Sequence, residues 1–257
     1  AETQFGDDVD TYDERVYEKA HEMLDAWIDN GSFVRDPQKA YYVYELTMDG
    51  RVQTGIVACA SIDDYANNVI KKHENTRADK EADRIHHVDT CSAQTGPIFL
   101  AYRFNQVIGD VVAAVKQTPA LYDFVADDGI RHRVFKISDA AQIEAIENAF
   151  AGIDDIYIAD GHHRAASAVK VGFKRREEHP DYDGTEEFNY FLSVLFPDEE
   201  LMIMDYNRVV KDLNGMTEEQ FLAKMNELFT VSQIGGAIGG ALSESEVRPK
   251  KKGDFAM

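Results

Sequence analysis

The sequence predicts an α/β fold of the α+β type, in which helices flank a mixed β-sheet. Two observations support this class. Short runs rich in β-branched and aromatic residues are interleaved with runs of helical periodicity along most of the chain. Some of the strand-like runs also follow one another directly, which is typical of antiparallel pairs, whereas strands separated by helices favour parallel ones. A sheet that contains both kinds of pair is therefore expected.

The first elements are a helix and a hairpin. Residues 13–30 repeat apolar side chains every three or four positions, as an amphipathic helix does. The strand-like runs 40–48 and 51–60 are joined by Asp49 and Gly50, a dipeptide that favours positive φ and therefore predicts a β-hairpin.

The middle and the second half of the chain continue the alternation. Ser61, with Asp64 three residues later, predicts the start of a second helix that ends near His73. Residues 73–87 carry charges at most positions and predict a loop followed by a short exposed helix. The remaining expected elements are strands over 96–104, 130–137, 154–159, 188–196 and 201–210, and helices over 140–150, 163–172 and 217–229.

Charge and composition exclude several classes of partner. The chain has 47 acidic and 27 basic residues, a formal net charge of -20, which repels nucleic acid and anionic membrane surfaces. An anionic substrate therefore needs a locally basic pocket. The two cysteines, Cys59 and Cys91, lack metal-ligand spacing, and no apolar run is long enough to cross a bilayer. We expect a cytoplasmic protein, and whether it forms a homodimer stays open.

The strongest chemical signal is the run IADGHHRAASAV at residues 158–169. It places Asp160, Gly161, His162, His163 and Arg164 between an apolar strand and an alanine-rich helix. Free backbone N–H groups and the helix dipole at such a helix start bind phosphate or carboxylate, and an arginine adds a bidentate contact. Asp160 can hold a metal ion or orient a histidine, and the histidines can shuttle a proton.

The alternative interpretation of this run is purely structural. Asp160 would cap the helix, and the histidines would be surface residues of its first turn. Capping needs only one short polar side chain, so this leaves the two histidines and Arg164 unexplained.

A second polar cluster follows the predicted second helix. Glu74 beside His73 can serve as a general base, and Glu74 with Asp83 can supply carboxylates for a divalent ion. Arg77 and Arg84, with Thr76, are candidates for phosphate contacts. A solvated loop and helix face is the simpler interpretation of these residues.

Other patterns carry less information. Arg208, which follows Asn207 in the strand-like run 201–210, is a further candidate for an anion contact. The alternative interpretation is an ordinary arginine on an edge strand. The adjacent His86 and His87 lack the spacing of a helical zinc pair. The sequence has no P-loop, no dinucleotide glycine fingerprint, no nucleophile elbow and no protein-kinase signature.

The run Asp160-Gly161-His162-His163-Arg164 resembles the hallmark of the bacterial and archaeal family called domain of unknown function 1015. KKHENTRADKEADR, TGPIFLAY, NYFLSVLF and MDYNRVV are similar to further segments of that family, so the resemblance covers most of residues 10–230. Members of the family usually begin with an additional segment, which we expect this chain to lack. The resemblance implies a single catalytic or nucleotide-binding domain over residues 1–230, and the glycine pairs beyond it predict a poorly structured tail over 231–257.

The same run resembles, more distantly, the strand-to-helix turn of the ParB/sulfiredoxin fold, one branch of which comprises free-serine kinases. This resemblance implies a ParB/sulfiredoxin-like core with family-specific additions. It assigns nucleotide-phosphate contact to Gly161, His162, His163 and Arg164, and metal or catalytic work to Asp160. Glu74 with His73 is the candidate for accepting or returning the hydroxyl proton. Thr76, Arg77, Arg84 and Arg208 are candidate nucleotide contacts, with Asp83 a candidate metal ligand.

These features lead to one expected function and two alternatives. The expected function is phosphoryl transfer between ADP or ATP, with Mg²⁺, and free serine, phosphoserine or a similar small hydroxy metabolite. One alternative is a nucleotide-gated regulatory or binding protein without turnover. The other is a metal-dependent phosphatase in which the histidines and Asp160 are ligands.

Overall fold

The computed structural model describes residues 1–202, 204, 207–233, 248–249, 251 and 253–256. The chain divides into two units, Ala1–Met202 and Ile203–Met257. This division precedes residue 230, the predicted end of the first domain, so helix α7 (Glu218–Leu228) lies in the second unit. Much of the predicted tail, residues 234–247, 250, 252 and 257, lies outside the described residues.

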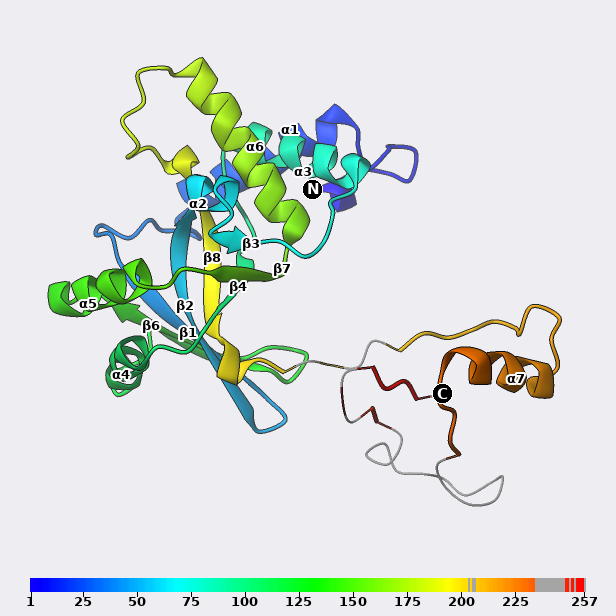
Figure 1. The fold of residues 1–257 in the computed structure, drawn as a ribbon. Helices are drawn as coiled ribbons and strands as arrows, with labels where there is room; N and C mark the ends of the chain where they lie inside the picture. The colour runs from blue at the N-terminus through cyan, green and yellow to red at the C-terminus, as the bar shows by residue number, and fades with distance from the viewer. Residues whose placement is uncertain (203, 205–206, 234–247, 250, 252, 257) are drawn as a thin grey trace. The chain divides into compact units, whose positions relative to one another are not determined.

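The first unit contains the sheet and its helices (Figure 1). Its strands are β1 (Tyr41–Met48), β2 (Arg51–Ser61), β3 (Ile70–Lys71), β4 (Ile98–Tyr102), β5 (Tyr122–Val125), β6 (Arg131–Ile137), β7 (Ile156–Asp160) and β8 (Tyr190–Pro197). Its α-helices are α1 (Glu14–Asp29), α2 (Ile62–Ala66), α3 (Ala78–Cys91), α4 (Gln106–Val115), α5 (Ala140–Ala151) and α6 (His162–Glu178).

The strands form one mixed sheet, which confirms the predicted fold class. The order of its eight strands is β3-β7-β4-β8-β2-β1-β6-β5. The pairs β3–β7 and β4–β8 are parallel, and all other neighbouring pairs are antiparallel. The predicted hairpin is confirmed, because Asp49 and Gly50 both adopt positive φ, 50° and 79°, between β1 and β2.

The helices gather over two parts of the sheet. Helices α4 and α5 pack together and α4 reaches β6, whereas α6 packs on β4 and β8 and also contacts α3, which in turn contacts α1 (Figure 1). The core contains the alternating residues of the central strands, for example Ile98, Leu100 and Ile158, together with Ala165 and Ala168 of α6. Small residues on the buried face of α6 let its backbone approach the sheet closely.

The predicted second helix starts as expected but ends early. The side chain of Ser61 accepts a hydrogen bond from the backbone N–H of Asp63, so it caps α2. The helix ends at Ala66 rather than near His73, because Asn68 adopts a left-handed φ of 60° and the chain then extends into β3. Strand β3 was not predicted.

Two further differences between the predicted and the observed elements lie between β4 and β5 and after β8. Helix α4 was not predicted, since its valine-rich sequence is also typical of a strand. The strand predicted over 201–210 is wrong for residues 201, 202, 204 and 207–210, which form no strand, and residues 203, 205 and 206 lie outside the described part. Among the described residues, no helix combines the length and the hydropathy that a membrane span requires.

Candidate functional site

The strand-to-helix turn between β7 and α6 has the geometry that the sequence predicted. Ile158 of β7 is buried in the core, and the strand ends at the exposed Asp160. Gly161 is the N-cap residue of α6, with φ +95°, a conformation that side chains other than glycine rarely adopt. His162 is the first helical residue, so the polar run occupies the amino end of a helix of 17 residues. A helix start of this kind suits an anion.

Arg164 holds this turn against the neighbouring strand. Its guanidinium donates to the Asp160 carboxylate at 2.7 Å and to the backbone carbonyl of Pro97 at 2.6 Å. Pro97 directly precedes β4, which pairs with β7. A Cβ at Gly161 would lie 3.0–3.2 Å from three atoms of the same guanidinium. The turn therefore needs glycine both for its φ and for the arginine that crosses it.

Strand β3 brings the second polar cluster to the same edge of the sheet. It pairs in parallel with β7, with Ile70 opposite Ile156 and Lys71 opposite Tyr157. Because parallel strands end at the same edge, the residues that follow β3 lie beside those that follow β7. His73 and Glu74 thereby reach the start of α6.

His162 joins the two clusters. The backbone N–H of His73 donates a long hydrogen bond of 3.5 Å to His162 Nε2, and the two imidazole rings meet edge to face at a centroid distance of 4.4 Å. The Glu74 carboxylate lies 3.8 Å from the other ring nitrogen, Nδ1. Since Nε2 accepts, the network assigns the proton of the neutral imidazole to Nδ1, facing Glu74. His162 is 5% exposed, whereas the Glu74 side chain is 59% exposed, so Glu74 is the member that a substrate can reach.

A buried carboxylate ties the loop after β3 to helices α3 and α6. Glu81 of α3 accepts hydrogen bonds from Thr76, at 2.5 Å, and from Lys170 of α6. The Lys170 ammonium, followed by the Thr76 hydroxyl, holds the pKa of Glu81 below its usual value despite burial. The Ser167 hydroxyl contacts the backbone carbonyls of Glu81, at 3.3 Å, and His163, at 2.7 Å. Thr76 is thus a structural member of the site.

His163 lies in the first turn of α6, directly after His162. Its Nδ1 atom is buried and has no hydrogen-bond partner among the described residues. Asp160, Gly161, His162 and Arg164 flank it in the sequence.

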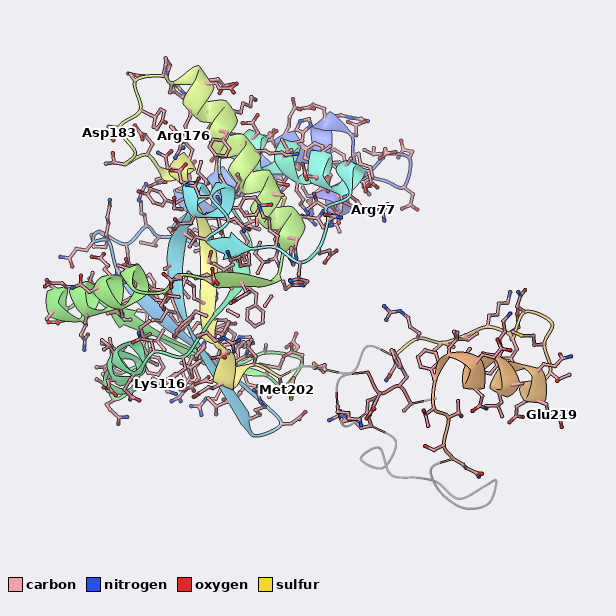
Figure 2. All side chains as sticks on the ribbon, in the orientation of Figure 1. Arg77, Lys116, Arg176, Asp183, Met202 and Glu219 are labelled. Carbon is pink, nitrogen blue, oxygen red and sulfur yellow. The ribbon has the colours of Figure 1, made fainter. Side chains whose placement is uncertain are left out.

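Three predicted site residues of the first unit, Asp83, Arg77 and Arg84, have their partners elsewhere than at this turn. Asp83 accepts a hydrogen bond of 2.7 Å from the Tyr17 hydroxyl of α1. Arg77, which is labelled in Figure 2, is exposed and pairs with Asp79 at 2.8 Å, and the exposed Arg84 lies 4.0 Å from Asp83. Arg208 belongs to the second unit.

The carboxylates available for a metal ion are few. Among the described residues, no group of three or more histidine, cysteine or acidic side chains is arranged to hold one. Asp160 and Asp83 were both predicted as ligands, and only Asp160 lies at the turn. Its side chain is 73% exposed, which suits a Mg²⁺ ion that takes one carboxylate and most of its other ligands from water and substrate phosphates.

The assembled groups offer three chemical capabilities. The start of α6 with Arg164 can bind an anion, Asp160 can contact its counter-ion, and Glu74 beside His162 can accept a proton. Sequence reasoning missed Glu81, Lys170 and Ser167, which hold these groups in place. Nothing in a charged helix or an alanine-rich helix distinguishes such residues before their packing is known.

We predict that Gly161→Ala destabilises the protein by about 1–2 kcal/mol, because alanine is strained at positive φ and its Cβ crowds Arg164. Urea unfolding measures the change. Gly152→Ala is the matched control, since Gly152 has φ -94° and an added Cβ meets only ordinary contact at 3.6 Å. Equal changes in the free energy of unfolding for the two variants would contradict the geometry of the turn.

We predict that His162 titrates below its ordinary pKa of 6.5, because burial and then the neighbouring His73 disfavour its charged form. Glu74 opposes this, so Glu74→Gln should lower the pKa of His162 further. Because the pKa of His162 is higher in the unfolded chain, the unfolded chain binds this proton more tightly. The contribution of the neutral His162 to the free energy of unfolding is therefore complete above pH 6.5 and is lost as the pH falls. Imidazole titration by NMR, assigned with His162→Gln, tests both directions; a pKa at or above 6.5, or a rise in Glu74→Gln, would refute them.

Comparison with known proteins identifies a family. No curated protein and no solved structure gives a significant match to this chain. A family model described as "Protein of unknown function (DUF1015)" matches residues 1–257, which include both units. The chain therefore belongs to the DUF1015 family.

Proposed function

We propose that the protein is a phosphotransferase that moves a phosphoryl group between ATP and the hydroxyl of a small metabolite, with free serine as the first candidate. One observation carries the proposal: the parallel pairing of β3 with β7 sets Glu74 and His162 beside the start of α6. Phosphoryl transfer needs little beyond positioning and neutralisation of charge, and these groups supply both.

In the transfer, the serine hydroxyl oxygen attacks the γ-phosphorus of ATP. A new oxygen–phosphorus bond forms, the bond from phosphorus to the β,γ-bridging oxygen breaks, and ADP leaves with that electron pair. The hydroxyl proton passes to the Glu74 carboxylate, which lies beside His162. In the reverse direction ADP attacks phosphoserine and Glu74 returns the proton.

The groups at the start of α6 have separate tasks in this mechanism. Backbone N–H groups of the first turn and the free N–H groups of Arg164 contact the phosphate oxygens. Asp160 would hold Mg²⁺ on the nucleotide, and the ion supplies charge neutralisation when bound. The helix start supplies the local positive field that a chain of net charge -20 needs to bind a nucleotide, whereas Arg164, whose charge is balanced by Asp160, supplies N–H donors.

The sequence resemblance supports the same function. The run Asp160–Arg164 is similar to the turn of ParB/sulfiredoxin-fold serine kinases, in which phosphates sit on a helix start. The phosphatase alternative has no equivalent support, since no observation in the described residues favours a protein-bound metal cluster.

Phosphorus NMR tests the proposal on the full chain with Mg²⁺, using ATP with serine and, separately, ADP with phosphoserine. We expect new phosphoserine or ATP resonances. Glu74→Gln should lower kcat by about 10²–10⁴-fold with little change in the KM for ATP, because it removes the proton acceptor and leaves the anion site intact. Glu144→Gln is the matched control, since Glu144 is an exposed residue of α5.

The alternatives give different results in the same experiment. Nucleotide binding by calorimetry without any transfer would overturn the transferase in favour of the regulatory protein. Free phosphate released from phosphoserine without nucleotide would overturn it in favour of the phosphatase. Transfer that survives in Glu74→Gln would refute the assigned proton acceptor.

A further inference from the structure

The two edges of the sheet differ in how well they are protected against pairing with another strand. Strand β3 forms one edge and β5 the other. An edge strand leaves half of its backbone N–H and C=O groups without a partner in the sheet, and proteins protect such edges with short strands, lysine or proline. Strand β3 has only two residues, one of which is Lys71. Strand β5 has four residues, Tyr122–Val125, and none of them is a lysine or a proline.

The side chains at the β5 edge are apolar and exposed. The exposed fractions are 59% for Tyr122, 53% for Phe124 and 64% for Val125, and Leu121, directly before the strand, is 49% exposed. Single exposed apolar side chains are normal on a protein surface, but a contiguous group of them marks a contact with another molecule. Phe124 is held in place, because its ring stacks on His132 of β6 at a centroid distance of 5.0 Å. A ring that is already fixed loses little conformational entropy in an interface.

The hydrogen bonds between β5 and β6 show which backbone groups of β5 point away from the sheet. The N–H of Ala126 donates to the carbonyl of Ile130 at 2.9 Å, in the antiparallel register of the two strands. Because backbone direction alternates along a strand, the backbone groups of Phe124 also face β6, whereas those of Asp123 and Val125 face outward. Among the described residues, no hydrogen bond from outside the sheet reaches these outward groups. They are therefore available to a further strand.

The β5 edge carries no net charge. Asp123 is the one charged residue of β5, and the guanidinium of Arg131 donates to both of its carboxylate oxygens, at 2.8 and 2.7 Å. These hydrogen bonds hold the pKa of Asp123 below its usual value, so the pair stays ionised and balanced. The whole chain has a net charge of -20, so two copies repel each other in general. A neutral apolar edge is a part of the surface where that repulsion is weak.

These properties favour a second copy of the chain as the occupant of the edge. An acidic or a basic peptide would find no unpaired charge on β5, because Asp123 and Arg131 satisfy each other. An antiparallel edge is complementary to itself, since a twofold axis sets the donors of each copy opposite the acceptors of the other. We propose that two copies of the chain pair through β5 into one continuous antiparallel sheet, with the twofold axis at Phe124.

The outward backbone groups and the charge of Asp123 fix the position of the axis. With Phe124 on the axis, the outward groups of Asp123 bond to those of Val125 in the second copy, and the same bonds form on the other side of the axis. Each aspartate then lies opposite a valine, and the two Phe124 rings face each other as an aromatic cross-strand pair. An axis at Asp123 would instead set two carboxylates directly opposite each other, which is unfavourable.

Sedimentation equilibrium of the full chain tests the dimer. An edge of four strand residues is smaller than a standard interface, so we expect a dissociation constant on the order of 10 μM. The measured mass should rise from 28.9 kDa towards twice that value as the protein concentration passes this range. Phe124→Lys should weaken the association about tenfold or more, because it sets two like charges directly opposite each other.

Val52→Lys is the matched control for this substitution. Val52 is a strand residue of β2 that is 45% exposed, so the change adds the same charge at a similar exposed position and should leave the association unchanged. A monomer at every concentration, or equal association of the Phe124→Lys and Val52→Lys variants, would overturn the proposal.

Cross-linking tests the position of the axis. The two Phe124 residues would form a non-hydrogen-bonded pair with Cα atoms about 4.5 Å apart, a distance that a disulfide spans. Phe124→Cys should therefore give a disulfide-linked dimer on mild oxidation, whereas Tyr122→Cys, on the same face but away from the axis, should not. Both variants carry Cys59→Ser, which removes the exposed native thiol. A dimer in which Phe124→Cys does not cross-link would refute the assigned axis. Because β5 lies at the opposite edge of the sheet from β3, these outcomes are independent of the proposed phosphotransferase activity.

Discussion

The candidate site depends on one short piece of β-structure, the parallel pairing of β3 with β7. Only Ile70 and Lys71 form β3, yet their register against Ile156 and Tyr157 fixes where the following residues lie. Without this pair, Glu74 would sit on a charged loop with no reason to approach α6. With it, an acidic side chain and a buried imidazole meet at 3.8 Å beside a helix start. The proposed phosphoryl transfer depends on the groups that this pairing brings together.

A two-residue strand is too short to hold a loop by itself, and the rest of the unit supplies the missing constraint. Glu81 bonds both Thr76 of the loop and Lys170 of α6, so the loop is tied at a second point. Gly172 lets α6 approach the segment that precedes β8 closely, since a Cβ there would lie 2.4 Å from the backbone carbonyl oxygen of Phe188. Loop, α3 and α6 therefore act as one support for Glu74, His162 and the turn at Gly161.

The sequence predicts the mixed fold, the hairpin and the run from Asp160 to Arg164, because each has a strong local pattern. The position of β3 was not predictable, since its pairing with β7 is long-range and it follows a left-handed Asn68 that cuts a predicted helix short. Asp83, the predicted metal ligand, and Glu81, which ties the loop to α6, lie on the same charged helix, and no sequence pattern distinguishes their surroundings. Their different surroundings, Tyr17 for one and Lys170 for the other, follow from how α3 packs.

The most direct measurement is paramagnetic broadening of the histidine side-chain NMR signals by a small amount of Mn²⁺ with ADP. If nucleotide phosphates and their metal ion bind at the start of α6, the signals of His73, His162 and His163 should broaden first. His132 on β6 and His179 at the far end of α6 should stay sharp, which makes them internal controls. Broadening centred on His132 or His179, or equal broadening of every histidine, would contradict the account.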